Sequence, residues 1–384
     1  MRPIQTSTKL PRVGTTIFTV MSQLAVKHGA INLGQGFPDF DCDPQLQQRL
    51  TNAMHAAHNQ YAPMTGVPTL REAIASKNQA LYGYRHDPET EITVTAGATQ
   101  ALMATILALL PAGDEVIVLE PAYDSYAPAI ALAGGRPVFV PLDVTQAYAP
   151  DWDAVRAAMT DKTRMILINF PHNPTGRTLR DGDVRELENI VDQTGVLVVS
   201  DEVYEHVVFD GVAHRSIMRS SLLAARSVVI SSFGKTFHTT GWKVGYACAP
   251  AALSAEIRKV HQFMVFAVNT PAQYAFAEHL IDPRPYLDLP KFYQAKRDLF
   301  VAGLRRTPFR PLACEGTYFV LADYSQLSDL PEVEFAKKLI VDHGVASIPV
   351  SVFYDVPVDH KVVRFCFAKQ DSTLQQALER LSVL

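Results

Sequence analysis

Four polar side chains with complementary chemistry follow strand-like runs in the middle of the chain. Asn173 comes shortly after the run MILIN, and Asp201 and Tyr204 come after VLVVS. Lys235 comes after the run VVISS. In open parallel sheets, ligands bind beyond the carboxyl ends of the strands, so these four side chains are expected to meet in one crevice.

Each of these groups has a defined task toward an aromatic aldehyde that carries a phosphate. The amine of Lys235 can form a Schiff base with the aldehyde. The carboxylate of Asp201 can hold a proton on a pyridine nitrogen, which makes the ring an electron sink. Tyr204 and Asn173 can hydrogen-bond to an oxygen on the ring. The set therefore predicts a covalent cofactor site centred on Lys235.

A phosphate site is predicted in the segment TAGATQALMATILALL. Gly97, Ala98 and Thr99 lie between the strand-like run EITVT and a helix. Backbone N–H groups and the helix dipole can therefore face an anion at this point. Two side chains on either side of the lysine, Ser232 and Lys243, can add contacts to the same phosphate.

Each candidate also has a plain structural explanation. Asp201 could cap a helix, and Asn173 could only form a turn. Residues 97–99 could be an ordinary strand-to-helix turn. Arg364 lies in the apolar run VVRFCF, where an unpaired charge is costly, so it is expected to bind either an anionic ligand or a structural carboxylate.

The overall composition is that of a globular chain. The 384 residues include 35 Lys plus Arg and 39 Asp plus Glu, a net charge of −4, with 48% apolar residues. The absence of a basic excess argues against nucleic acid as the main partner. The longest apolar stretch is shorter than the roughly 20 residues of a membrane span. The four cysteines form no CxxC pair, so no metal site and no disulfides are predicted, and a cytoplasmic location is expected.

The pattern of elements predicts an α/β fold with a mostly parallel sheet covered by helices on both faces. Strand-like runs alternate with helical segments between residues 92 and 249, as in βαβ units. The Pro- and Asp-rich segment IDPRPYLDLP indicates a boundary, followed by a smaller α+β domain. The predicted division is residues 1–45 as an N-terminal arm and part of the small domain, 46–282 as the large cofactor-binding domain, and 283–384 as the small C-terminal domain.

These motifs resemble those of the class I/II pyridoxal-phosphate aminotransferases of fold type I. NPTG, DEVY and SSFGKTFHTTGWKVG occur in the family's order, and the resemblance extends from LGQGFPDF to VVRFCFA. Within the family, NQYAPMTG, TAGAT, HNPTG, DEVYEH and CEGTYF look most like the methionine and aromatic aminotransferases and the kynurenine aminotransferase group. The resemblance implies pyridoxal 5′-phosphate as cofactor, no metal, and a homodimer with shared active sites.

The resemblance also assigns a role to each candidate residue. Lys235, Asp201 and Tyr204 would be catalytic: the lysine would carry the cofactor and move the substrate proton, and the carboxylate would pair with the ring nitrogen. Many family members have arginine where Lys243 stands, and the kynurenine-like branch accepts lysine. The other assignments are Asn173 and Tyr204 at the ring oxygen, Tyr123 stacked on the ring, Gly97, Ala98, Thr99, Ser232 and Lys243 at the phosphate with Tyr61 from the partner subunit, and Arg364, Gly36 and Asn173 at the substrate carboxylate.

The implied activity is transamination, in which an amino acid passes its amino group to a 2-oxo acid. Methionine and aromatic amino acids are the preferred donors, and the mechanism is ping-pong through the Lys235 Schiff base. One alternative is a cysteine-S-conjugate β-lyase on the same scaffold. A second alternative, from another class, is a non-catalytic sensor domain of the same fold. Such sensors carry a DNA-binding domain ahead of the aminotransferase-like part, and this sequence has no basic helix-turn-helix extension. Phe18, Phe37 and Phe266 are candidate walls of the substrate pocket.

Overall fold

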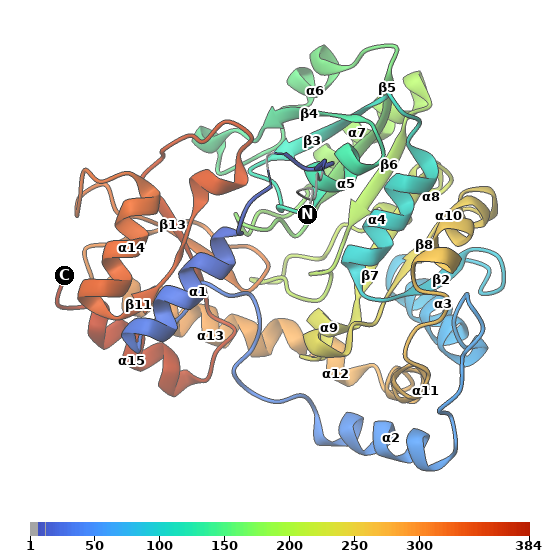
Figure 1. Ribbon diagram of the computed structural model, residues 1–384, viewed down its shortest axis with the longest axis horizontal. Helices are drawn as coiled ribbons and strands as arrows, with labels where there is room; N and C mark the ends of the chain where they lie inside the picture. The colour runs from blue at the N-terminus through green and yellow to red at the C-terminus, as the bar shows by residue number, and fades with distance from the viewer. Residues whose placement is uncertain (1–6, 12) are drawn as a thin grey trace, which may run out of the picture.

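The computed structural model describes residues 7–11 and 13–384, which form a large seven-stranded sheet with helices around it and a smaller four-stranded sheet beside it (Figure 1). Residues 1–6 and 12 of the predicted N-terminal arm lie outside the described residues. Within the described residues, no helix combines the length and apolar character needed to span a bilayer. The four cysteines are buried free thiols.

The large sheet has the strand order β2-β8-β7-β6-β5-β3-β4. Strands β4, β3, β5, β6 and β7 pair in parallel, whereas β8 runs antiparallel to both β7 and β2. The prediction of a mostly parallel sheet is therefore confirmed. The strands are β2 (Ile92–Thr95), β3 (Glu115–Glu120), β4 (Arg136–Pro141), β5 (Thr163–Asn169), β6 (Leu197–Asp201), β7 (Ser227–Ser232) and β8 (Gly245–Cys248).

Helices cover both faces of this sheet because the central strands are apolar on both faces. Alternate residues of β5 divide between two core clusters: Met165 and Leu167 pack in one, and Ile166 and Ile168 pack in the other. The first cluster includes α4 (Ala98–Leu109), α5 (Tyr126–Leu132) and α10 (Ala251–Met264). The second includes α6 (Trp152–Ala158), α7 (Asp181–Thr194) and α8 (Ser221–Ala224).

A third core cluster joins the β2–β8 edge to three further helices. These are α2 (Pro44–His55), α3 (Pro68–Tyr82) and α11 (Thr270–His279). The short helical elements between these segments are η1 (Val144–Gln146), η2 (Ile217–Arg219), α9 (Phe233–Thr236), η3 (Thr240–Trp242), α12 (Arg284–Leu287) and η4 (Val350–Phe353).

The smaller sheet has the order β12-β13-β10-β9, with antiparallel pairing throughout. The first described helix, α1 (Ile17–His28), packs on α14, and β1 (Ile31–Asn32) pairs in parallel with β11 (Val345–Ala346), so two distant parts of the chain lie together (Figure 1). The predicted domain limits at residues 45 and 282 stay a prediction. The remaining elements are β9 (Arg310–Pro311), α13 (Leu289–Leu304), β10 (Phe319–Asp323), α14 (Glu332–His343), β12 (Ile348–Pro349), β13 (Val362–Cys366) and α15 (Asp371–Leu381).

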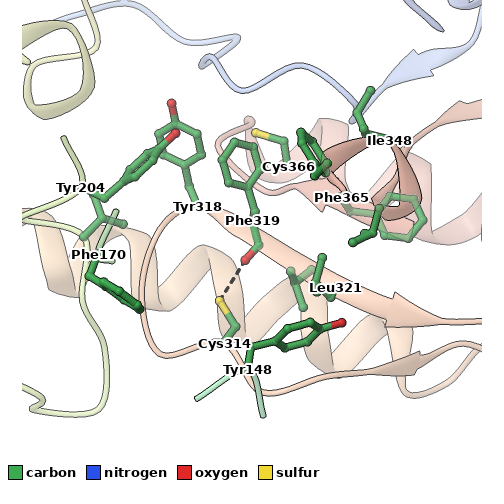
Figure 2. Close-up of a cluster of buried hydrophobic side chains, with 14 of the residues drawn as sticks. Tyr148, Phe170, Tyr204, Cys314, Tyr318, Phe319, Leu321, Ile348, Phe365 and Cys366 are labelled. Atoms are coloured by element: carbon green, nitrogen blue, oxygen red, sulfur yellow. Dashed lines mark hydrogen bonds between the residues drawn. The ribbon is translucent and has the colours of Figure 1, made fainter. Parts of the chain in front are cut away.

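One apolar core runs from the large sheet into the small one without interruption. Figure 2 shows part of it, with Phe170 and Tyr204 from the large sheet's loops beside Tyr318 and Phe319 at the start of β10. The Cys314 thiol donates to the backbone oxygen of Phe319 at 3.0 Å, which ties the preceding loop to β10. Because this core is close-packed, it fixes the position of the small sheet relative to the large one.

Candidate active site

A cavity of about 350 Å³ lies beyond the carboxyl ends of the parallel strands, where the two sheets face one another. Every candidate catalytic, cofactor-binding or substrate-binding residue except Tyr61 lines it, so residues spread over more than 320 positions of sequence come together. The candidates in its wall are Gly36, Gly97, Ala98, Thr99, Tyr123, Asn173, Asp201, Tyr204, Ser232, Lys235, Lys243 and Arg364.

Asp201 ends β6 deep in the cavity wall. The Tyr126 hydroxyl donates to its Oδ2 at 2.8 Å and the backbone N–H of Val203 donates to its Oδ1 at 3.3 Å. Burial raises the pKa of Asp201 to about 6, against the lowering effects of these hydrogen bonds and of Lys235. A buried carboxylate that forms no ion pair with any of the described residues fits a ligand that brings a protonated ring nitrogen.

Asn169, the last residue of β5, organises the loop that carries Asn173. Its Oδ1 accepts from the backbone N–H of Asn173 at 3.0 Å, and its Nδ2 donates to the backbone oxygen of Asp201 at 2.8 Å. One buried side chain therefore links the ends of β5 and β6 and fixes both candidates relative to each other. Asn169 did not stand out in the sequence, because it ends the strand-like run itself.

Lys235 lies on α9, directly after β7, and its Nζ atom is held at two points. It donates to the backbone oxygen of Gly36 at 3.1 Å and to the Tyr318 hydroxyl at 2.9 Å. The pKa of Lys235 is lowered to about 8, mainly by burial; the nearby Arg364 and Lys243 contribute to the lowering, while Cys366 and Asp201 oppose it. An amine with this pKa exists in both protonation states near neutral pH, as a proton-transfer group requires.

The predicted phosphate site is an open cradle at the start of α4. Its N-cap, Gly97, has φ of +77° and no side chain to cap the helix, so the first N–H groups are left for a ligand. A Cβ at Gly97 would lie 3.2 Å from the Nζ of Lys243, and one at Gly245 would lie 3.0 Å from the backbone nitrogen of Ala98. The two glycines thus keep the space free, and the cradle fits a phosphate group.

Arg364 stands in β13, and its side chain is almost completely buried. Its Nη1 donates to Asn173 Oδ1 at 2.6 Å and its Nη2 donates to the Gly34 backbone oxygen at 3.1 Å, while its Nε has no partner among the described residues. Burial lowers the pKa of Arg364 to about 10. Among the described residues no carboxylate forms an ion pair with it, which favours the anionic-ligand explanation over the structural one.

Tyr61 lies outside the cavity of its own chain. Its side chain is 82% exposed, and its ring meets the ring of Phe266 edge-on at 5.1 Å between centroids. Its role at a partner's phosphate stays a prediction. Of the three candidate pocket walls, Phe18 and Phe37 line the cavity, whereas Phe266 does not.

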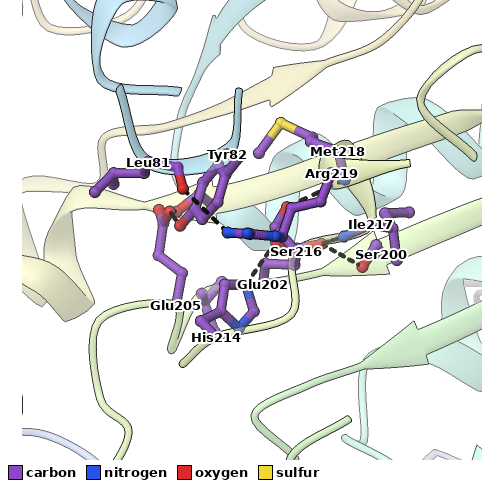
Figure 3. A network of polar contacts seen from close by, with 12 residues as sticks. Leu81, Tyr82, Ser200, Glu202, Glu205, His214, Ser216, Ile217, Met218 and Arg219 are labelled. Atoms are coloured by element: carbon purple, nitrogen blue, oxygen red, sulfur yellow. Dashed lines mark hydrogen bonds and ion pairs between the residues drawn. The ribbon is translucent and has the colours of Figure 1, made fainter. Parts of the chain in front are cut away.

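A buried network of ion pairs and hydrogen bonds holds the DEVYEH turn in place, and Figure 3 shows part of it. Glu205 accepts from Lys77 Nζ at 2.7 Å and from Tyr82 at 2.5 Å. Burial alone would raise the pKa of Glu205, but Lys77 and the hydrogen bonds bring it well below its usual range. Glu202, on the same turn, is bonded to Ser200 and His214. These contacts hold the turn that presents Asp201 and Tyr204.

The sequence and the fold identify the family. Residues 28–381 match the family "Aminotransferase class I and II", and the chain belongs to it. Members of this family depend on pyridoxal phosphate. Independently of the family match, the residues of the cavity fit that cofactor, because a phosphate cradle, a buried carboxylate and a buried lysine line the same space. The protein is therefore a pyridoxal-phosphate-dependent aminotransferase of fold type I, and the corresponding predictions are confirmed.

Similar proteins include several aminotransferases with different named substrates. The chain is 52% identical to "Methionine aminotransferase" of Escherichia coli K12, with 100% of this chain and 99% of that one covered. A solved structure of E. coli YbdL, described as having a methionine aminotransferase function, has a TM-score of 0.97, 52% identity and full coverage of both chains.

Two other relatives carry other names. "Probable N-succinyldiaminopimelate aminotransferase DapC" of Mycobacterium tuberculosis is 41% identical, with 99% and 98% covered. "Kynurenine--oxoglutarate transaminase 1" of Mus musculus is 36% identical, with 94% and 93% covered. The predicted resemblance to methionine and kynurenine aminotransferases is confirmed.

Proposed function

We propose that this aminotransferase takes the amino group from methionine and from aromatic amino acids and passes it to a 2-oxo acid. The observation that carries the proposal is the charge of the cavity wall. Among the described residues that line it, the cations are Lys235, Lys243 and Arg364. All three already have a proposed partner, so none remains to bind a carboxylate on a substrate side chain.

The rest of the wall favours a neutral, apolar side chain. Phe18, Phe37 and Phe319 line the cavity together with Tyr123. Asp124 also lines it, and a carboxylate there repels a second carboxylate on the substrate. The identity to a methionine aminotransferase supports the same preference.

The residues of the site have separate tasks in this proposal. When bound, pyridoxal phosphate supplies an aldehyde that reacts with amines and a ring that accepts electrons from the substrate. Gly97, Ala98, Thr99, Ser232 and Lys243 hold the phosphate group, Asp201 holds the proton on the ring nitrogen, Tyr204 and Asn173 hold the ring oxygen, and Tyr123 covers the ring.

Arg364 orients the substrate and Lys235 moves its proton. The planar guanidinium binds the α-carboxylate through two parallel hydrogen bonds, with Gly36 beside it, which fixes the direction of the Cα–H bond. The amine of Lys235 would then take the Cα proton as a base and would deliver it, as an acid, to the carbon of the cofactor's aldehyde group. Water releases the 2-oxo acid, and a second 2-oxo acid takes up the amino group, which gives ping-pong kinetics.

The test is a half-reaction with the cofactor-loaded protein and one amino acid at a time, without a 2-oxo acid acceptor. Methionine, phenylalanine and tyrosine are expected to yield one equivalent of 2-oxo acid per site, and Lys235→Ala is expected to yield none. A yield with aspartate and glutamate alone would overturn the substrate proposal. Steady release of pyruvate and ammonia from a cysteine S-conjugate, without an acceptor, would favour the β-lyase instead.

We further propose that the enzyme works as a cytoplasmic homodimer with shared active sites. Exposed aromatic side chains support this: Tyr61 and Phe266 contact each other while both are exposed, and Phe263, at the end of α10 and three residues before Phe266, is 87% exposed. A second copy that covers this surface would remove it from water and bring Tyr61 toward the neighbouring phosphate cradle. Light scattering of the purified protein tests the assembly, and a monomer that is fully active would overturn it.

A further inference from the structure

Tyr318 is the nearest side-chain partner of the candidate catalytic lysine. Its hydroxyl oxygen lies 2.9 Å from Lys235 Nζ and 2.7 Å from the backbone oxygen of Gly36. The side chain is buried and fixed on three sides by rings: Tyr204 at 5.1 Å, Phe319 at 5.0 Å and Tyr293 at 5.6 Å between centroids. Figure 2 shows the Tyr318 and Tyr204 side chains next to each other at the edge of the shared core.

The donors and acceptors of this group have one consistent arrangement. The Gly36 carbonyl can only accept, so the single O–H of Tyr318 donates to it. The oxygen of Tyr318 is then an acceptor toward Lys235, and the amine must donate. Burial raises the pKa of Tyr318 well above its usual range, so the hydroxyl keeps its proton at working pH.

Two N–H groups of Lys235 are therefore engaged by fixed oxygens, one on Gly36 and one on Tyr318. An amine nitrogen has three positions besides its carbon. With two of them engaged, the third carries the lone pair when the amine is neutral and the remaining N–H when it is charged. Because Lys235 lines the cavity, that third position is the one available to a ligand there.

We propose that Tyr318 is a positioning residue for Lys235, which together with the Gly36 carbonyl holds the cofactor-free amine so that its third position faces the substrate. The inference rests on the catalytic role proposed for Lys235. The same arrangement serves both proton transfers, because the lone pair that takes the Cα proton becomes the N–H that would deliver it to the carbon of the cofactor's aldehyde group. The long side chain of the lysine loses its rotamer freedom before the reaction and not during it.

The support for the Gly36 carbonyl comes from the small sheet. A Cβ at Gly36 would lie 2.6 Å from the Phe319 ring, so this loop passes against β10 more closely than any side chain permits. Lys369 donates to the next backbone oxygen, that of Phe37, at 2.7 Å. Both oxygens that hold Lys235 thus belong to segments that lie at β10 of the small sheet, whereas Lys235 itself lies on α9, which follows β7 of the large sheet.

The first test measures the amine in the cofactor-free protein, so that it does not depend on turnover. Lysine labelled with ¹³C at Cε gives an NMR titration, with the Lys235 signal identified by its loss in Lys235→Arg. The titratable groups that face this amine include Asp201 from β6, Tyr204 in the turn after β6, Lys243 after η3, and Arg364 and Cys366 from β13, and Tyr318→Phe replaces none of them. Loss of one acceptor is expected to lower the pKa of Lys235 by about one unit from about 8.

The matched control is Tyr293→Phe. Tyr293 is a buried phenol beside Tyr318, and its hydroxyl has no hydrogen-bond partner among the described residues. The control is expected to leave the pKa of Lys235 unchanged. Should Tyr318→Phe fail to fold, 3-fluorotyrosine at position 318 keeps the ring and hydroxyl but weakens the acceptor, and a smaller fall in pKa is expected.

The second test is the half-reaction of the loaded protein with methionine. Tyr318→Phe is expected to slow it by about 10- to 100-fold, to increase the isotope effect with Cα-deuterated methionine, and to leave methionine affinity unchanged. An unchanged pKa of Lys235, or a lowered pKa with an unchanged rate, overturns the inference. Failure of the proposed function is seen separately, as a half-reaction that persists in Lys235→Ala.

Discussion

Asp201→Asn is expected to stabilise the cofactor-free protein while it removes activity. The carboxylate is buried, and its pKa is raised to about 6 from 3.8. Above that pH the folded protein therefore holds a negative charge that is poorly solvated. Asparagine has the same shape. Its oxygen can accept from the Val203 N–H as Oδ1 does now, and its amide can donate to the Tyr126 oxygen.

The magnitude follows from the two pKa values. Between pH 3.8 and 6 the folded protein binds more protons at Asp201 than the unfolded chain does, so the free energy of unfolding falls as the pH rises through this range. The difference of about 2.2 pKa units corresponds to about 3 kcal/mol lost above pH 6. The variant avoids this loss, so its advantage over the wild type is small near pH 4 and about 2 to 3 kcal/mol at pH 8.

The assay is urea unfolding of both proteins without cofactor, at pH 4 and at pH 8. Asp161→Asn, at an exposed aspartate, controls for the change in net charge and is expected to have no such pH-dependent effect. The loaded Asp201→Asn variant is expected to lose methionine half-reaction activity, because the ring nitrogen no longer meets a carboxylate. A variant that is no more stable than the wild type at pH 8 would refute the reasoning about burial.

Three further changes have direct expectations. Arg364→Lys keeps the charge but not the paired hydrogen bonds, and is expected to lower kcat/KM for methionine by about 10- to 200-fold with unchanged cofactor affinity, as seen by steady-state kinetics and cofactor titration. Gly97→Ala places a side chain at φ of +77° and near Lys243, and is expected to weaken cofactor binding at least about 5-fold by equilibrium dialysis; unchanged binding would contradict the cradle. Lys77→Met leaves Glu205 buried without its cation and is expected to cost about 3 to 5 kcal/mol in urea unfolding, with partial recovery when Glu205→Gln is added.

The chemistry of the site could be predicted from the sequence more completely than its geometry could. Asn173, Asp201 and Lys235 each follow a β-branched strand, and in a parallel sheet such positions share one edge, so their meeting was predictable from local pattern alone. The strands β5, β6 and β7, which correspond to the runs MILIN, VLVVS and VVISS, were equally clear, because a strand buried on both faces is a continuous apolar run. Short strands such as β9, β11 and β12 extend over two residues, too few for any period to be recognised.

Other features depend on contacts between residues far apart in the chain. Tyr318 lies 83 positions from Lys235, and CEGTYF gave no indication of a partner, since tyrosines in strands are usually part of a core. The role of Tyr126 was equally unpredictable, because nothing in the helical run that contains it indicates a hydrogen bond to Asp201, 75 positions away. The antiparallel direction of β8 was also absent from the local pattern.

The sequence by itself determined which functional groups are present and which strand ends carry them, because both depend on residue type and on periods of two or three to four residues. Only the tertiary structure decided how each group behaves. Burial sets the pKa of Asp201 and Lys235, and the packing of β10 against the loop at Gly36 sets which oxygens hold the lysine amine. Desolvation and hydrogen bonding act over a few ångströms in space, between residues whose separation along the chain has no fixed period.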